Sequence, residues 1–172
     1  RIFDNDEGPN TGGMGAYSPT PIVDDSLAKI IQEEVIEKTI HAMKGEGILF
    51  KGFLYAGIMI RDGKPYVLEY NVRFGDPEAQ VLLPRMKSDL YPYIEASINQ
   101  ELDKMPELIW SNQFALCVIL SSLGYPNKYP VNAKISGINQ VLKMQNIYVF
   151  HSGTKIEKNI LLTNGGRVLG IT

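Results

Sequence analysis

Polar and apolar side chains alternate from Leu68 to Arg73, in the order Leu-Glu-Tyr-Asn-Val-Arg. Successive side chains of a β-strand point to opposite faces, so Glu69, Asn71 and Arg73 are expected on one face. Neighbours on that face lie about 7 Å apart, a separation that a cation with its bound phosphate oxygens can span. A hard cation such as Mg2+ takes one or two protein oxygens and completes its shell with phosphates and water. Glu69 and Asn71 are therefore candidate metal ligands, and a polar strand edge that faces solvent is the alternative.

A long helix is predicted before this strand, because apolar residues recur at helical spacing over residues 26–44. Asp24 and Asp25 can cap its first turn. Gly45 and Gly47 follow the last apolar position and are expected to end it.

A hairpin and two shorter helices are expected next. Residues 52–60 and 66–72 predict two strands joined by a turn at Asp62-Gly63. Residues 76–86 predict a helix that starts at Asp-Pro and is bent or stopped early by Pro84. Residues 88–99 begin with Ser-Asp and predict the second helix.

The last third of the chain differs in its predicted secondary structure. Residues 101–112 are mixed in charge and form an expected connection, after which short segments rich in β-forming residues predict a separate β-rich lobe. The expected strands are 113–121, 141–144, 147–151, and a pair, 160–163 and 167–172, around Asn164-Gly165-Gly166.

Composition narrows the class of protein. With 172 residues, 44% of them hydrophobic, and a net charge of −2, the chain has enough apolar material for a core and no basic character suited to nucleic acid. No apolar run approaches the roughly 20 residues of a membrane span.

Cys117, the single cysteine, lies in an apolar run and is expected in the core, so we expect a cytoplasmic protein without disulfides. The chain begins at Arg1, within what reads as the end of a strand, and is expected to be a fragment.

A glycine loop opens the chain, with four glycines among residues 8–15. Glycines let backbone N–H groups approach an anion closely and form an anion-binding nest. The loop lacks the Gly-Lys-Ser/Thr ending of a Walker motif, and a tight surface turn is the alternative. Asp6, just before it, could receive an amine. The candidate binding residues of the loop are Asn10, Thr11, Gly12, Gly13 and Gly15.

Two cations in the β-rich lobe are further candidates. Lys155 follows Ser152-Gly153-Thr154, and Arg167 follows Gly165-Gly166. Either could hold a phosphate from its short flexible element, and solvated charge is the alternative.

Six motifs together resemble one enzyme family. They are Gly-Pro-Asn-Thr-Gly-Gly-Met-Gly-Ala-Tyr-Ser-Pro (8–19), Gly-Phe-Leu-Tyr-Ala-Gly (52–57), Leu-Glu-Tyr-Asn-Val-Arg-Phe-Gly-Asp-Pro-Glu (68–78), Lys-Ser-Asp-Leu (87–90), His-Ser-Gly-Thr-Lys (151–155) and Gly-Gly-Arg-Val-Leu (165–169). In this order, and over essentially the whole chain, they resemble phosphoribosylamine–glycine ligase, the glycinamide ribonucleotide synthetase family of ATP-grasp enzymes. The first and third motifs are long and specific.

The resemblance implies an α+β fold in two domains. Residues 1–100 would be the C-terminal part of an ATP-grasp fold, an antiparallel sheet with packed helices. Residues 101–112 would be a linker, and 113–172 a truncated β-rich C-terminal domain. The N-terminal half of the same enzyme would supply the adenine pocket, so the fragment is not expected to catalyse alone.

The resemblance also implies a reaction of purine biosynthesis. ATP would phosphorylate the carboxylate of glycine, and the amine of 5-phosphoribosylamine would attack the resulting glycyl phosphate to give glycinamide ribonucleotide. Glu69 and Asn71 would hold Mg2+ or Mn2+ against the ATP phosphates, and Arg73 would stabilise the transferred phosphoryl group. The glycine loop would close over the acyl phosphate and exclude water.

One departure from other ATP-grasp enzymes is visible. Many of them place another acidic metal ligand on the preceding strand, where this chain has Ala56 and Gly57. Either residue could face Glu69, and neither binds metal through a side chain, so two protein ligands are expected. Two other functions stay open: another ATP-grasp carboxylate–amine ligase, or a non-catalytic nucleotide-binding module.

Overall fold

The computed structural model describes residues 1–172, apart from the side chain of Asp6. The chain forms two compact units, each built from segments that are separate in sequence. Residues 1–18, 76–85 and 112–172 make the first unit, and residues 19–75 and 86–111 make the second. Both contain helices and antiparallel strands, which confirms the α+β class. The predicted linker at 101–112 divides the chain into two consecutive domains, whereas the compact units combine separate segments. The predicted domain boundaries stay a prediction.

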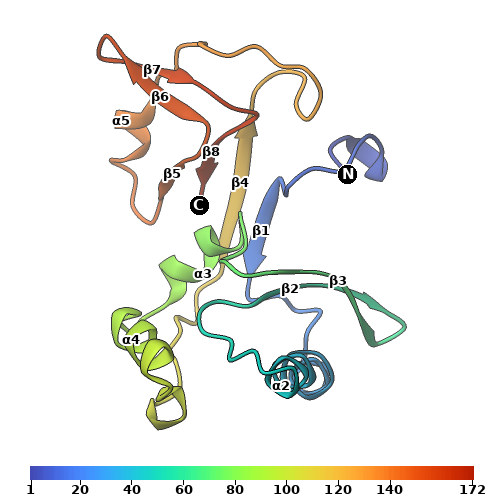
Figure 1. Ribbon diagram of the computed structural model, residues 1–172. Helices are drawn as coiled ribbons and strands as arrows, with labels where there is room; N and C mark the ends of the chain where they lie inside the picture. The colour runs from blue at the N-terminus through green and yellow to red at the C-terminus, as the bar shows by residue number, and fades with distance from the viewer. The chain divides into compact units, whose positions relative to one another are not determined.

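A four-stranded antiparallel sheet forms the centre of the first unit, in the order β1-β4-β8-β5. Figure 1 shows strands from both ends of the chain, blue β1 and dark red β8, on either side of β4. The strands are β1 (Gly15–Ser18), β4 (Ala115–Ser121), β5 (Val149–His151) and β8 (Arg167–Ile171). The glycine loop therefore leads directly into a sheet whose other strands come from residues 115–171.

One face of this sheet packs on α3 (Ala79–Arg85), which carries Pro84 and ends one residue later. Val81 of the helix and Cys117 and Ile119 of β4 form the buried cluster between them. Burial raises the pKa of the Cys117 thiol, so the thiol stays neutral in the core, as expected for the single cysteine.

A separate hairpin in the first unit joins β6 (Thr154–Glu157) to β7 (Ile160–Thr163). The predicted pairing of 160–163 with 167–172 is therefore wrong, because β7 pairs with β6, which the sequence pattern missed, and β8 pairs with β4 and β5. The predicted strand at 141–144 is also wrong. Residues there end α5 (Ile138–Val141) and continue in turns, and their backbone bonds are local, including Leu142 N to Ile138 O (2.9 Å) and Met144 N to Val141 O (2.9 Å).

The second unit begins with the predicted long helix, which has three consecutive parts. They are α1 (Asp25–Ile31), the π-helical η2 (Gln32–Glu37) and α2 (Lys38–Gly45). Asp24 caps the start, since its Oδ1 accepts a hydrogen bond from Leu27 N (2.8 Å). Gly47, just after the end, has the left-handed φ of +79° that glycine adopts without strain.

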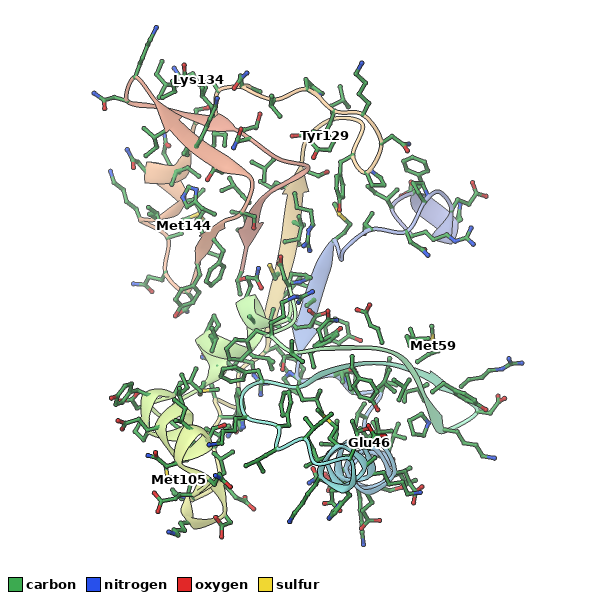
Figure 2. All side chains as sticks on the ribbon, in the orientation of Figure 1. Glu46, Met59, Met105, Tyr129, Lys134 and Met144 are labelled. Atoms are coloured by element: carbon green, nitrogen blue, oxygen red, sulfur yellow. The ribbon has the colours of Figure 1, made fainter. Side chains whose placement is uncertain are left out.

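The predicted hairpin of this unit joins β2 (Tyr55–Arg61) to β3 (Lys64–Asn71), with Asp62-Gly63 at its turn. A bulge interrupts the pairing, because Gly57 is opposite Glu69 whereas the next residue, Ile58, is opposite Val67. Figure 2 shows the side chains of this hairpin, with Met59 of β2 labelled.

The remaining elements of this unit are α4 (Tyr91–Asn99) and the short η3 (Leu102–Lys104). Oδ1 of Asp89 accepts a hydrogen bond from Tyr91 N (3.0 Å) just before the first turn of α4, whose N-cap residue is Leu90. In the part of the chain that the structure describes, no helix combines the length and the hydrophobicity needed to cross a bilayer.

Candidate active site

The three polar residues of the alternating segment are joined in series by hydrogen bonds. Nδ2 of Asn71 donates to Oε1 of Glu69 (3.0 Å), and Nη2 of Arg73 donates to Oδ1 of Asn71 (3.3 Å). Nη1 of Arg73 donates to the carbonyl oxygen of Phe74 (2.7 Å). Glu69 and Asn71 therefore share one side of β3, as strand alternation predicts, and Arg73, two residues after the end of the strand, bonds to Asn71.

The other side of β3 faces the long helix. The hydroxyls of Tyr70 and Thr39 are 2.7 Å apart and form a hydrogen bond, which attaches the strand to α2. Because Tyr70 lies between Glu69 and Asn71 in sequence, its side chain points away from theirs. The helix therefore lies on the side of the strand opposite Glu69, which is exposed, and Asn71, which is partly exposed.

Strand β2 shapes the same polar face through residues without charge. Gly57 pairs with Glu69, and Tyr55 pairs with Asn71. A Cβ atom at Gly57 would lie 3.1 Å from Cγ of Glu69 and 3.6 Å from Cε1 of Tyr55. Glycine at this position therefore leaves the room that the glutamate side chain occupies. Sequence reasoning missed Tyr55, which its two-residue spacing from Gly57 would have placed on this face once the register was known.

The donors present fit a divalent metal of the magnesium type. Glu69 offers carboxylate oxygens and Asn71 an amide oxygen, both hard ligands, and their side chains are within hydrogen-bonding distance of each other. Gly57 opposite Glu69 supplies no acid. Among the residues that the structure describes, no group of three or more His, Cys, Asp and Glu side chains comes together. A metal on this face would therefore depend on substrate phosphates and water for most of its shell.

The glycine loop belongs to the first unit and is held by its own contacts. Oγ1 of Thr11 accepts a hydrogen bond from Gly13 N (3.2 Å), and Gly13 has a φ of +105° that favours glycine. Asn10 is exposed. The predicted role of Asp6 concerns a side chain outside the described part of the structure.

The structure brings one of the two cations of the β-rich lobe to this loop. Arg167, at the start of β8, donates from Nη1 to the carbonyl oxygens of Gly12 (2.8 Å) and Gly13 (3.2 Å). Nζ of Lys155 instead lies 3.1 Å from a carboxylate oxygen of Glu157 on the same strand, β6. Sequence reasoning did not predict the contact between Gly12 and Arg167, which are 155 positions apart. The predicted phosphate roles of both cations stay predictions.

Two family models match the chain. Residues 1–79 match the ATP-grasp (A) domain of phosphoribosylglycinamide synthetase, and residues 115–172 match its C domain. The two matches include all the predicted site residues.

Individual proteins agree with the family models. The chain is 42% identical over 171 residues to a phosphoribosylamine–glycine ligase from Caldanaerobacter subterraneus, with 99% of this chain and 40% of the relative covered. It is 46% identical over 172 residues to the trifunctional purine biosynthetic protein adenosine-3 of Gallus gallus, with 100% of this chain and 17% of that protein covered. The crystal structure of phosphoribosylamine–glycine ligase from Thermotoga maritima superposes with a TM-score of 0.82 at 35% identity, with 99% of this chain and 41% of that chain covered.

The chain thus spans about 40% of the length of the bacterial ligases that it matches. The matches include both family domains and almost every residue of the chain. The chain belongs to the phosphoribosylglycinamide synthetase family.

Proposed function

We propose that the full-length protein carrying this chain ligates glycine to 5-phosphoribosylamine at the expense of ATP, and releases glycinamide ribonucleotide, ADP and phosphate. The proposal rests on the family of the chain and on one structural observation, the hydrogen-bonded series Glu69–Asn71–Arg73 at the end of β3. Phosphoryl transfer depends mainly on positioning and on neutralising negative charge, and these three groups suit that task.

Each of the three residues has a distinct proposed role. Glu69 and Asn71 would hold Mg2+ or Mn2+, which when bound neutralises charge on the ATP phosphates. Arg73 presents a planar fork of N–H donors, which suits the oxygens of a phosphoryl group or an acyl phosphate. Arg73 is exposed, and its hydrogen bonds to Asn71 and Phe74 lie within its own segment, so it can turn toward such a ligand at little cost.

The chemistry needs a phosphorylated intermediate because a carboxylate is a poor electrophile. ATP would transfer its terminal phosphoryl group to the carboxylate of glycine, giving a glycyl phosphate and ADP. The amine of 5-phosphoribosylamine would then attack the acyl carbon, and phosphate would leave. The N–H groups of the glycine loop suit an anionic part of a substrate. The N-terminal part of the enzyme would contribute the adenine pocket, and a cytoplasmic location remains our expectation.

The test is substrate-dependent release of phosphate by the full-length protein. We expect ADP and phosphate only when glycine, 5-phosphoribosylamine, ATP and a divalent cation are all present. A chelator should abolish turnover, and added Mg2+ or Mn2+ should restore it. Turnover with another carboxylic acid and without glycine would favour a different ATP-grasp ligase. Tight ATP binding without ADP formation would favour a non-catalytic nucleotide-binding module.

A further inference from the structure

Arg167 binds two segments that are distant from it in sequence. Besides its bonds to Gly12 and Gly13, its Nη1 donates to the carbonyl oxygen of Asp76 (2.8 Å), and its Nη2 donates to Oδ2 of Asp76 (2.8 Å). Its side chain is only 21% exposed. We propose that Arg167 is a positioning residue that holds the glycine loop, residues 8–15, in its ligand-binding conformation and is not itself a phosphate ligand. The ligand-binding part of this inference rests on the proposed function.

The contacts of Arg167 set the direction of two peptide groups. A trans peptide group points its N–H and its C=O in opposite directions. Because Arg167 holds the carbonyl oxygens of Gly12 and Gly13, the N–H groups of Gly13 and Met14 point away from the guanidinium. The N–H of Gly13 already donates to Oγ1 of Thr11 within the loop. A cation on the carbonyl side also polarises these peptide groups, which strengthens their N–H groups as donors. The arrangement therefore fixes the loop and directs the N–H of Met14 away from the guanidinium, where an anion can accept its hydrogen bond.

The loop fits closely against its support at both glycines, and most tightly at Gly13. A Cβ atom at Gly12 would lie 3.2 Å from Cζ of Arg167. A Cβ atom at Gly13 would lie 2.7 Å from Cδ of Pro77, which is closer than real Cβ atoms approach other atoms. The two glycines thus serve the contact with Arg167 and Pro77 as well as the conformation of the loop.

The backbone of Arg167 is itself fixed by a cluster of glycines. Gly153 N donates to the carbonyl oxygen of Arg167 (2.9 Å), and a Cβ atom at Gly153 would lie 2.5 Å from that oxygen. A Cβ atom at Gly166 would collide with the ring of Tyr125 and lie 3.1 Å from Cε1 of Tyr129, which is labelled in Figure 2. Gly153 and Gly166 therefore allow the close packing that fixes the backbone of Arg167.

Asp76 completes the arrangement and argues against a phosphate at Arg167. Its Oδ2 accepts from Arg167, and its Oδ1 accepts from Nε2 of Gln80 (2.8 Å). The carboxylate therefore balances the guanidinium charge in a partly buried position. A phosphate at Arg167 would have to displace a bonded carboxylate of the same sign, at a cost in both charge pairing and hydrogen bonds.

The experiment compares three variants of the full-length protein: Arg167→Gln, Arg167→Lys and the control Lys143→Gln. Lys143 is exposed, lies in the same unit, and loses the same single charge. Amide hydrogen exchange of residues 8–18 is the first measurement, and it needs no assumption about function. We expect exchange there to be about tenfold faster in Arg167→Gln and unchanged in the control. Arg167→Lys keeps the charge but cannot make the forked set of bonds, so it should give an intermediate rate.

Steady-state kinetics is the second measurement. A positioning role predicts that Arg167→Gln lowers kcat about tenfold while KM for ATP stays within about threefold. A raised KM for ATP or for 5-phosphoribosylamine, with unchanged exchange in residues 8–18, would identify Arg167 as a phosphate ligand and overturn the inference. Unchanged exchange and unchanged kinetics would overturn it as well.

The two measurements separate this inference from the proposed function. If the wild-type protein does not ligate glycine, the proposed function fails, while hydrogen exchange still decides whether Arg167 holds the loop. Melting temperatures of all variants show whether each is folded. If Arg167→Gln does not fold, the exchange rate of Arg167→Lys decides the question: a rate equal to that of wild type contradicts the inference, and a faster one supports it.

Discussion

Arg73 and Arg167 both use a guanidinium fork, but their partners differ in kind. Arg73 is exposed and bonds to the side chain of Asn71 and the carbonyl of Phe74, both close to it in sequence. Arg167 is mostly buried and bonds to three backbone carbonyls and a carboxylate of two distant segments. A fork bonded to neighbours in sequence can exchange partners for a ligand without disturbing the fold. A fork bonded to distant backbone is committed to holding that backbone in place.

Among the residues grouped with Arg73, Glu69 should show the largest effect of substitution on the ligation rate. Glu69→Gln keeps the shape of the side chain and removes the charge that attracts a metal. We expect ligation by the full-length protein to fall about 10³-fold, with a higher Mg2+ concentration needed for the remaining rate. Metal titrations of ADP formation check this. The control Glu46→Gln makes the same change at an exposed position outside the polar face, and a similar loss in both variants would contradict the role of Glu69.

Arg73 sharpens the comparison with Arg167 directly. Arg73→Gln should lower the ligation rate about 100-fold, because a donor to developing phosphate charge is lost. Its free energy of unfolding should change by no more than about 0.5 kcal/mol, as for other exposed positions. Rate assays and urea unfolding of the same preparation give both numbers. Arg61→Gln, at an exposed pair with Asp62 (3.7 Å), is the control and should change neither. A marked loss of stability in Arg73→Gln would mean that the two arginines do not differ as described.

Gly13 tests how rigidly the glycine loop bound by Arg167 is held. Gly13→Ala places a methyl group 2.7 Å from Cδ of Pro77 at a φ of +105°, so both contact and backbone are strained. We expect a loss of about 2–3 kcal/mol in the free energy of unfolding.

Gly47→Ala separates the two causes of strain in that experiment. Gly47 also has a positive φ, +79°, but nothing lies within 4 Å of its added Cβ. Backbone strain alone should cost about 1 kcal/mol there. Urea unfolding measures both variants. Equal losses in the free energy of unfolding would show that the contact of the loop with Pro77 does not contribute to stability.

The same difference between local and distant contacts explains what could be predicted from sequence. The alternation around Glu69 and Asn71 is a local pattern, and the cap at Asp24 and the bond from Tyr91 N to Asp89 are local hydrogen bonds, so these features were predicted. The partner strands of β8 and the contact of Arg167 with Gly12 join residues far apart in sequence, and no pattern in a single chain indicates them. The strand prediction for 141–144 was wrong for another reason. The apolar residues there are typical of a strand, but their backbone groups form hydrogen bonds within local turns.

The hydroxyl of Tyr70 gives the smallest expected effect and compares the two faces of one strand. Tyr70→Phe removes the hydrogen bond to Thr39 on the helix side of β3 and leaves the ring in place. Because the tyrosine is 42% exposed, water replaces part of what is lost, and we expect a cost of less than about 1 kcal/mol. The ligation rate should stay within about twofold, since the hydroxyl points away from Glu69 and Asn71. Tyr66→Phe, on an exposed ring of the same strand, is the control for urea unfolding and for rate. A loss of rate in Tyr70→Phe comparable with that of Arg73→Gln would show that the helix-facing side of the strand takes part in the chemistry, and the assignment of one face to support and the other to catalysis would be wrong.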